Sequence, residues 1–146
     1  METMDAIWVR RIGNTDVRWF APPAGMDGSF PFVAAADVIV QLTADTAAVA
    51  GYLLAAQAEP LVGAVEIMSD DGPLLLVPHD HAKAVFMAGI AAGNTTEDVL
   101  EDYLSGAESA LYVHLAPMKR SRRERWLTAF RAKCIANGVN PSQEQA

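Results

Sequence analysis

The sequence contains very little cysteine and no long apolar segment. Cys134 is the one cysteine among 146 residues, which excludes an internal disulfide framework and any zinc site built from cysteines alone. The longest run of apolar or small residues, 47–56, is too short to cross the ~30 Å hydrocarbon core of a bilayer. Residues 1–5 are acidic and have no signal-peptide pattern. We therefore expect a soluble, cytoplasmic protein without a membrane partner.

Positive charge is also scarce, and it is unevenly distributed. The chain has 11 Lys and Arg against 18 Asp and Glu, for a formal charge of −7. Residues 1–118 have four cations and 16 carboxylates, a charge of −12, whereas residues 119–146 have seven cations and two carboxylates, a charge of +5. An acidic body with a basic C-terminal element indicates either two different partners or one partner that meets a single face of the protein.

Composition and length favour one folded domain. Hydrophobic residues make up 51% of the chain and charged residues 20%, which excludes an intrinsically disordered protein. A chain of 146 residues typically forms a single domain. We assign this domain to residues 1–138 and expect residues 139–146 to form a flexible tail.

Strand-forming residues around turn signals predict two β-hairpins. The first hairpin has strands at 7–12 and 17–20 around Gly13-Asn14, and the second has strands near 62–68 and 73–77 around Asp71-Gly72. A loop rich in proline and glycine covers 21–29 and leads into a short extended segment at 30–33.

Helical periodicity predicts the first of the helices. A helix starts at Ala34 and includes residues up to Leu42. A second helix follows Thr43 or Asp45 as its N-cap and ends at Pro60.

Three further helices are predicted towards the C-terminus. One runs from an Asp80 cap to Ala91, and another runs from Thr96 to Gly106. The segment 110–115 fits a strand or a helix equally well. The last helix begins with a capping box, Ser121 and Glu124, and stops at Asn137-Gly138. The predicted class is therefore α+β, with two hairpins packed against several helices.

The most prominent candidate for chemistry is His79-Asp80-His81. Two imidazoles one residue apart can reach one metal ion from an extended segment, but a usable site needs three or four ligands, and the sequence supplies no obvious others. We therefore interpret this segment as a helix start and predict neither a metal nor a cofactor.

The sequence also lacks familiar catalytic motifs. It has no Gly-x-Ser-x-Gly elbow, no Gly-Lys-Ser/Thr phosphate loop and no glycine-rich dinucleotide turn. Cys134 lies mid-helix beside Phe130 and Ile135, where a thiol packs more often than it reacts. We predict that the protein is not an enzyme.

A cluster of cations at the start of the last helix is the strongest binding signal. Such a cluster can neutralise phosphates, and cations at a helix N-terminus oppose the helix dipole, so an anion there would relieve a cost. The competing interpretation is a solvated basic turn paired with the protein's own acidic body. The candidate nucleic-acid-binding residues are Lys119, Arg120, Arg122, Arg123 and Arg125, extended by Arg10, Arg11 and Arg18 if the first hairpin lies beside this helix.

The order of elements resembles the BRO-N domain of phage antirepressors over about residues 7–138. That family begins with a hairpin containing a Gly turn, followed by a W-F-V-A-x-x-D-V segment that passes from strand to helix; the matching pieces here are Gly13-Asn14, Trp19-Phe20 and 32–42. It closes with a basic helix that 122–127 resembles. The sequence departs from the family in its Pro/Gly-rich insertion after Phe20 and in its more acidic body.

The resemblance implies a regulatory protein of a phage or mobile element that contacts DNA or a repressor through the basic helix, without catalytic residues. A second hypothesis is a small acidic inhibitor, similar to anti-CRISPR proteins, that binds a nucleic-acid-handling protein in place of nucleic acid. Its candidate residues are Asp70, Asp71, Glu97, Asp98, Glu101 and Asp102. A third hypothesis is a self-associating structural protein, a homo-oligomer in which the basic helix docks on an acidic neighbour.

Overall fold

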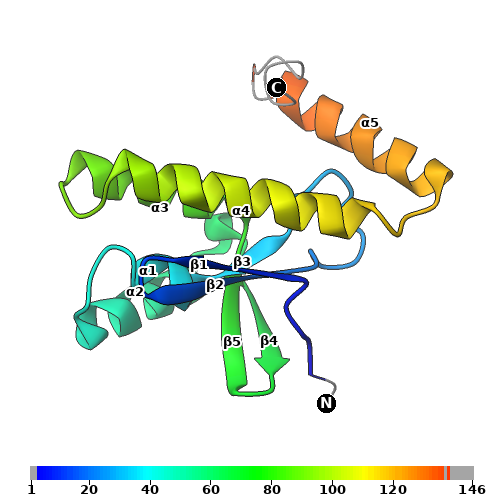
Figure 1. Cartoon of the computed structure of the whole chain (residues 1–146). Coiled ribbons are helices and arrows are strands. Elements are labelled where there is room, and N and C mark those ends of the chain that lie inside the picture. Colours follow the sequence, from blue (N-terminus) through cyan, green and yellow to red (C-terminus); the bar gives the residue numbers. More distant parts are fainter. Residues whose placement is uncertain (1–2, 137, 139–146) are drawn as a thin grey trace.

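Five antiparallel strands form one sheet in the order β1-β2-β3-β5-β4 (Figure 1). The computed structural model describes residues 3–136 and 138, and the predicted tail at 139–146 lies outside these residues. The strands are β1 (Trp8–Ile12), β2 (Thr15–Phe20), β3 (Phe32–Ala34), β4 (Val65–Ser69) and β5 (Gly72–Val77). The helices are α1 (Ala35–Ile39), α2 (Thr46–Ala58), the short 3₁₀ turn η1 (Pro60–Val62), α3 (His79–Ala91), α4 (Glu97–Leu115) and α5 (Arg120–Ala136).

The two predicted hairpins are both present, and β3 joins them into one sheet. β3 pairs with β2 through Val33 opposite Trp19, and with β5 through Val33 opposite Val77. Gly13 and Gly72 stand at the hairpin turns with φ of 61° and 113°, a backbone conformation that side chains disfavour. The α+β class is therefore confirmed, in a single antiparallel sheet with helices.

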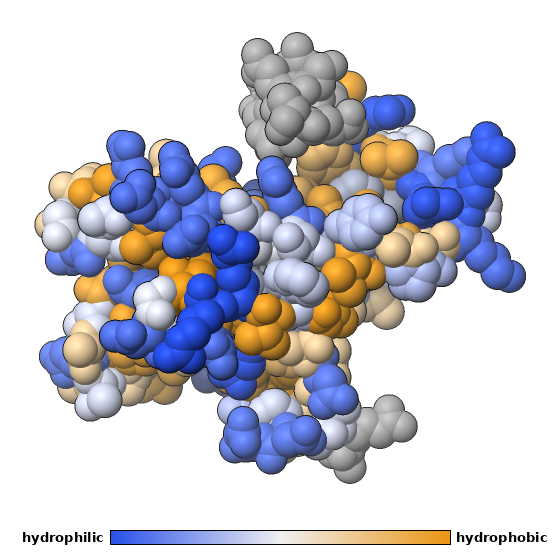
Figure 2. Space-filling model, viewed as in Figure 1, coloured by the Kyte–Doolittle hydropathy of each residue, from blue (hydrophilic) through white to orange (hydrophobic). Residues whose placement is uncertain are grey.

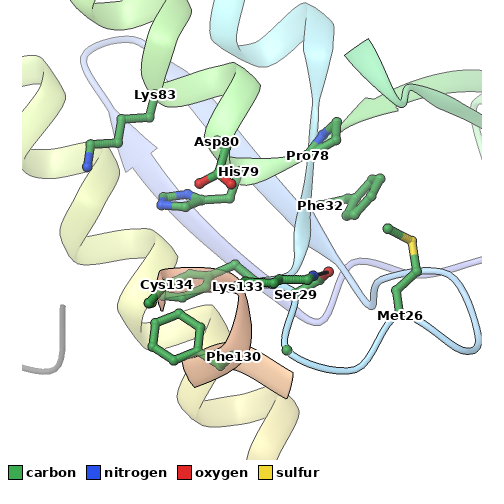
Figure 3. A pocket seen from close by; sticks show the side chains of 12 residues that line it. Met26, Ser29, Phe32, Pro78, His79, Asp80, Lys83, Phe130, Lys133 and Cys134 are labelled. Carbon is green, nitrogen blue, oxygen red and sulfur yellow. Dashed lines mark hydrogen bonds between the residues drawn. The ribbon is translucent and has the colours of Figure 1, made fainter. Parts of the chain in front are cut away.

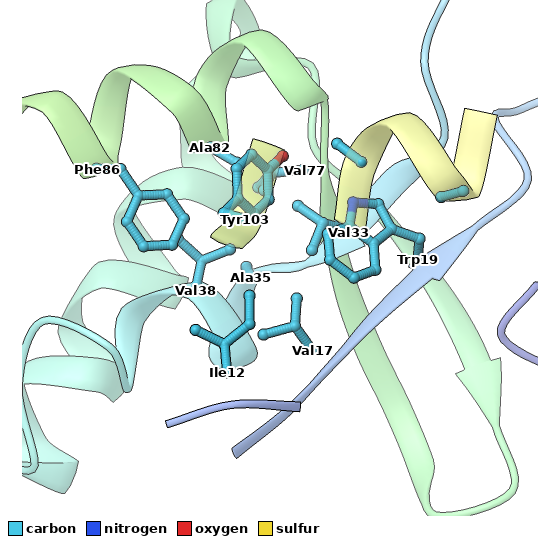
Figure 4. Packing of buried hydrophobic residues seen from close by; sticks show 12 residues of the cluster. Ile12, Val17, Trp19, Val33, Ala35, Val38, Val77, Ala82, Phe86 and Tyr103 are labelled. Atoms are coloured by element: carbon cyan, nitrogen blue, oxygen red, sulfur yellow. The ribbon is translucent and has the colours of Figure 1, made fainter. Parts of the chain in front are cut away.

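The main core lies between the sheet and the helices α3 and α4 (Figure 4). Trp19 and Val33 from the sheet pack with Phe86 of α3 and Tyr103 of α4, and all four side chains are fully buried. A smaller cluster occupies the opposite side of the sheet, because side chains alternate along a strand; its buried members are Phe20, Phe32, Ala34 and Leu76.

A partly buried ion pair ties α1 to β2. Asp37 of α1 accepts hydrogen bonds from Arg18 Nε at 2.9 Å, from Arg18 Nη2 at 3.1 Å and from the Arg18 backbone N–H at 3.1 Å. The pairing of β2 with β3 ends at Trp19, one residue after Arg18 in the chain. The Arg18 N–H therefore has no β3 carbonyl to bond to, and it donates to the Asp37 carboxylate instead. The hydrogen bond to Asp37 raises the pKa of Arg18, and the pair holds the short α1 against the sheet.

α2 is capped by Asp45, one of the two residues that the sequence offers for this role, and α4, which the sequence starts at Thr96, is capped by the Thr96 side chain. Asp45 accepts a hydrogen bond from the Ala47 N–H, and Thr96 accepts one from the Val99 N–H. Two other predicted caps are wrong. α3 starts at His79 with Pro78 at the N-cap, so Asp80 lies in the first turn and caps nothing.

The capping box predicted for the last helix is not formed. α5 starts at Arg120, which places Ser121 inside the helix, and the Glu124 carboxylate accepts its hydrogen bond from Arg120 Nε instead. α1 is also shorter than predicted, since it ends at Ile39 and turns replace helix up to Leu42.

α4 does not end at Gly106, and this corrects the prediction for two segments. The helix continues to Leu115, so 110–115 is helical. Gly106 is buried where α4 crosses the sheet, and a Cβ atom there would overlap the Trp19 ring and lie 3.1 Å from Arg10 Cδ. The glycine permits close approach of helix and sheet, and it is not a helix stop.

No helix in the described residues is long and apolar enough to cross a membrane.

Gly106→Ala is expected to destabilise the protein by about 1–3 kcal/mol, because the added methyl group overpacks the contact with Trp19. Gly51→Ala is the matched control, since Gly51 lies in α2 with nothing within 4 Å of the added Cβ. There the better helix propensity of alanine should stabilise by about 0.5–1 kcal/mol. Urea unfolding of both variants measures the difference. Equal effects at the two sites would contradict the assigned role of Gly106.

Candidate nucleic-acid interface

The basic residues of α5 gather at its exposed first turns. Lys119 precedes the helix, and all five cations of this segment are exposed. Figure 2 shows hydrophilic side chains clustered at the end of the molecule where α5 begins, beyond the sheet and the other helices of Figure 1. We call this cluster the basic helix start; it consists of Lys119, Arg120, Arg122, Arg123 and Arg125.

Few carboxylates neutralise the basic helix start. Arg120 pairs with Glu124 one turn along the same helix at 3.1 Å, but the Arg120 side chain is 89% exposed and such pairs contribute little. Asp27 reaches Arg122 Nη2 at 3.9 Å. For the other three cations, the described part of the chain offers no ion-pair partner within 4 Å. Asp27 is therefore the one carboxylate of the acidic body within 4 Å of this cluster among the described residues, and the positive charge of the basic helix start faces solvent.

The three arginines of the first hairpin do not extend this cluster. Arg10 pairs with Asp102 of α4 at 3.4 Å, Arg11 pairs with Asp16 across the hairpin at 3.3 Å, and Arg18 is held by Asp37. The hairpin lies against α4, away from the start of α5 (Figure 1). The structure thus brings together five of the eight predicted nucleic-acid-binding residues and separates the other three.

The Pro/Gly-rich loop before β3 packs directly against α5. Trp126 Nε1 donates to the Ser29 carbonyl at 3.2 Å, and Lys133 Nζ donates to Ser29 Oγ at 2.8 Å. Gly28, with φ of 82°, lies so close to the α5 backbone that a Cβ would be 2.6 Å from the Phe130 nitrogen. The Pro/Gly-rich loop therefore positions the basic helix.

A row of aromatic rings extends from this loop and α5 into the main core. Phe30 lies 4.6 Å from the ring of His79, and it also contacts Trp126 and Phe130 of α5 at 6.5 and 6.2 Å between centroids. His79 in turn stacks on Tyr103 at 5.5 Å. We call Phe30, His79, Tyr103, Trp126 and Phe130 the aromatic seam. Nothing in the sequence identified Ser29 and Phe30 as partners of the α5 rings Trp126 and Phe130.

The two histidines of the His-Asp-His segment point to different tyrosines. His79 Nδ1 shares a hydrogen bond of 2.9 Å with the Tyr103 hydroxyl, and His81 Nε2 shares one with the Tyr52 hydroxyl of α2. Among the described residues, no group of three or more His, Cys, Asp or Glu side chains is arranged to hold a metal ion. Both imidazoles act as links between helices.

Burial shifts the pKa values of these groups. It lowers the pKa of His79 to about 4 and also lowers the pKa of His81, because each ring is more easily buried when neutral. It raises the pKa of Tyr52 to about 12. Each pair is therefore neutral near pH 7, in keeping with a structural role.

The candidate acidic residues form two separate groups. Asp70 and Asp71 occupy the tip of the β4–β5 hairpin, whereas Glu97, Asp98, Glu101 and Asp102 lie on the first turns of α4. Figure 1 shows the hairpin tip and α4 on opposite sides of the molecule. A single partner surface therefore meets one group or the other.

Comparison with protein families, with curated proteins and with solved structures gives no match to this chain. The BRO-N resemblance stays a prediction that depends on the residues quoted for it.

His79 should make stability depend on pH. Below pH 6.5 the unfolded chain binds a proton that folded His79 does not take up until about pH 4, so stability falls as the pH is lowered through this window. The loss attributable to His79 approaches about 3 kcal/mol near pH 4. His79→Gln, which does not titrate, should flatten the curve of unfolding free energy against pH, and His114→Gln, at a less buried site, should flatten it less. An unchanged curve for His79→Gln would contradict the assignment.

Proposed function

We propose that this chain is a non-enzymatic regulatory protein of a phage or mobile element, of the BRO-N type, that binds DNA through the basic helix start. The observation that carries the proposal is the exposure of five cations at one end of a docked helix with few carboxylates beside them. Lys and Arg groups in this state can exchange their counterions for phosphates, which drives association with DNA.

The charge of the rest of the chain orients the contact. Residues 1–118 have a net charge of −12, which repels a polyanion at long range. DNA can therefore approach only at the end of the molecule where α5 begins. The helix dipole adds to this preference, since phosphates at a helix N-terminus are stabilised by its partial positive charge.

Binding to duplex DNA should be measurable at low salt and should weaken steeply as salt is added. If about four cations each neutralise a phosphate, the logarithm of the binding constant falls with the logarithm of salt concentration with a slope of about −3.6. Arg123→Glu should lower the affinity about tenfold and make the slope shallower. Fluorescence anisotropy of a labelled duplex measures both quantities.

The matched control is Arg131→Glu, which makes the same charge change on an exposed residue of α5 two turns further along. This variant should retain most of the affinity, and the triple variant Arg122→Glu, Arg123→Glu, Arg125→Glu should bind no DNA. Absence of binding at low salt, or equal losses for Arg123→Glu and Arg131→Glu, would refute the proposal.

A second candidate function is an acidic inhibitor of a nucleic-acid-handling protein, and the geometry of α4 favours it. Glu97, Asp98, Glu101 and Asp102 are all exposed, and residues four apart on a helix are separated by about 6 Å along its axis. Only Asp102 of this group pairs with a cation among the residues the structure describes, and its Arg10 partner lies at 3.4 Å. The group thus presents a row of negative charge to a basic protein surface.

Neutralising each acidic group by itself tests this second function. If α4 is the contact, Glu97→Gln with Glu101→Gln should abolish co-purification of a basic nucleic-acid-binding protein, while Asp70→Asn with Asp71→Asn should preserve it. Affinity purification of each variant with its partner, followed by titration of the purified pair, provides the measurement. Full partner binding by both variants would exclude the acidic mechanism.

Self-association, the third hypothesis, also stays a proposal. Its most suitable surface is α2 and the turn after it, where Leu54 is 68% and Leu61 is 94% exposed. A measurement of mass in solution decides it.

A further inference from the structure

A pocket of about 420 Å³ lies where α5 meets the body, and the nucleic-acid interface leaves it unused (Figure 3). Its wall on one side is the start of α3, its wall on the other side is the last part of α5, and the loop before β3 closes a third side. The aromatic and basic side chains that line it from these three segments are Phe30, His79, Lys83, Phe130 and Lys133.

The pocket offers flat apolar surface. Phe30 and Phe130, both partly exposed, line it together with the flexible thioether of Met26, whereas Phe32 is 1% exposed and offers a ligand almost no surface. The His79 ring is largely buried and neutral, and it stacks directly on Phe30. Rings and a thioether in this arrangement suit a planar aromatic group, which packs on ring faces and against sulfur.

The charges around the pocket favour an anion. Two of the three lysines in the chain, Lys83 and Lys133, line it, against one carboxylate, that of Asp80. Lys133 Nζ donates to the neutral hydroxyl of Ser29 at 2.8 Å. Within the described part of the chain, neither ammonium group has a carboxylate within 4 Å, so both positive charges are available to a ligand.

We propose that this pocket binds a small aromatic carboxylate, whose ring packs against Phe30 and Phe130 and whose carboxylate pairs with Lys133 and, once the flexible Lys83 side chain rotates towards it, with Lys83 (Figure 3). The volume falls in the range of small-molecule sites, and the lining combines aromatic rings with charged groups that can contact the ring and the carboxylate of such a ligand. Because the lining comes from both α5 and the body, a bound ligand stabilises the docked position of α5.

Titration of the full-length protein with three matched compounds tests the inference. Benzoate has the ring and the charge, benzamide has the same shape without the charge, and acetate has the charge without the ring. Benzoate should raise the thermal unfolding midpoint and shift the NMR signals of His79 and Phe130, whereas benzamide and acetate should do so at least tenfold more weakly. The titration contains no DNA, so its outcome is independent of the proposed function.

The lysines provide the matched variants. Lys83→Gln and Lys133→Gln should each weaken benzoate binding about tenfold, and Lys119→Gln, the third lysine, lies outside the pocket and should leave it unchanged. Circular dichroism confirms that each variant is folded, and Lys83→Gln keeps the Ser29 contact of Lys133 intact. No response to benzoate, an equal response to benzamide, or undiminished binding in Lys83→Gln and Lys133→Gln would overturn the proposal.

Discussion

The position of α5 depends on the ring of Phe30. This side chain is stacked on His79 on one side and contacts Trp126 and Phe130 on the other, so it connects the C-terminal helix to the core. Each aromatic pair of this kind contributes about 0.5–1.5 kcal/mol beyond the burial of its area. The hydrogen bond from Trp126 Nε1 to the Ser29 carbonyl then fixes how the helix is rotated.

Docking of α5 through its middle and end leaves its beginning exposed. Trp126, Phe130 and Cys134 face the body, whereas the five cations before Trp126 extend beyond it. The acidic body and the basic helix start are therefore segregated in space as well as in sequence. This segregation explains how a chain with a net charge of −7 can present one locally positive surface.

Local signals in the sequence predicted the parts of the fold that local interactions determine. Both hairpins and the cap at Asp45 were predicted because turn glycines and capping side chains act within a few residues. The end of α4 was mispredicted because Gly106 owes its presence to Trp19, a residue distant in sequence, and not to a helix terminus.

Long-range pairing also determined what was missed at the candidate site. The basic helix start was identified from its residues alone, since a run of cations needs no partner to be recognised. The link between His79 and Tyr103 and the separation of the hairpin arginines from α5 depend on how helices pack on the sheet. The sequence predicts a loop at 21–29, but only the contacts of Gly28 and Ser29 show that this loop packs against α5.

The most direct test of DNA binding through the basic helix start is to titrate the ¹⁵N-labelled protein with duplex DNA at low salt and to map the amide shifts. If DNA binds at the basic helix start, the shifted amides centre on residues 119–125, and the β1–β2 hairpin and the acidic turns of α4 remain unaffected. Shifts centred on the hairpin or on α4, or no shifts at any residue, would contradict it.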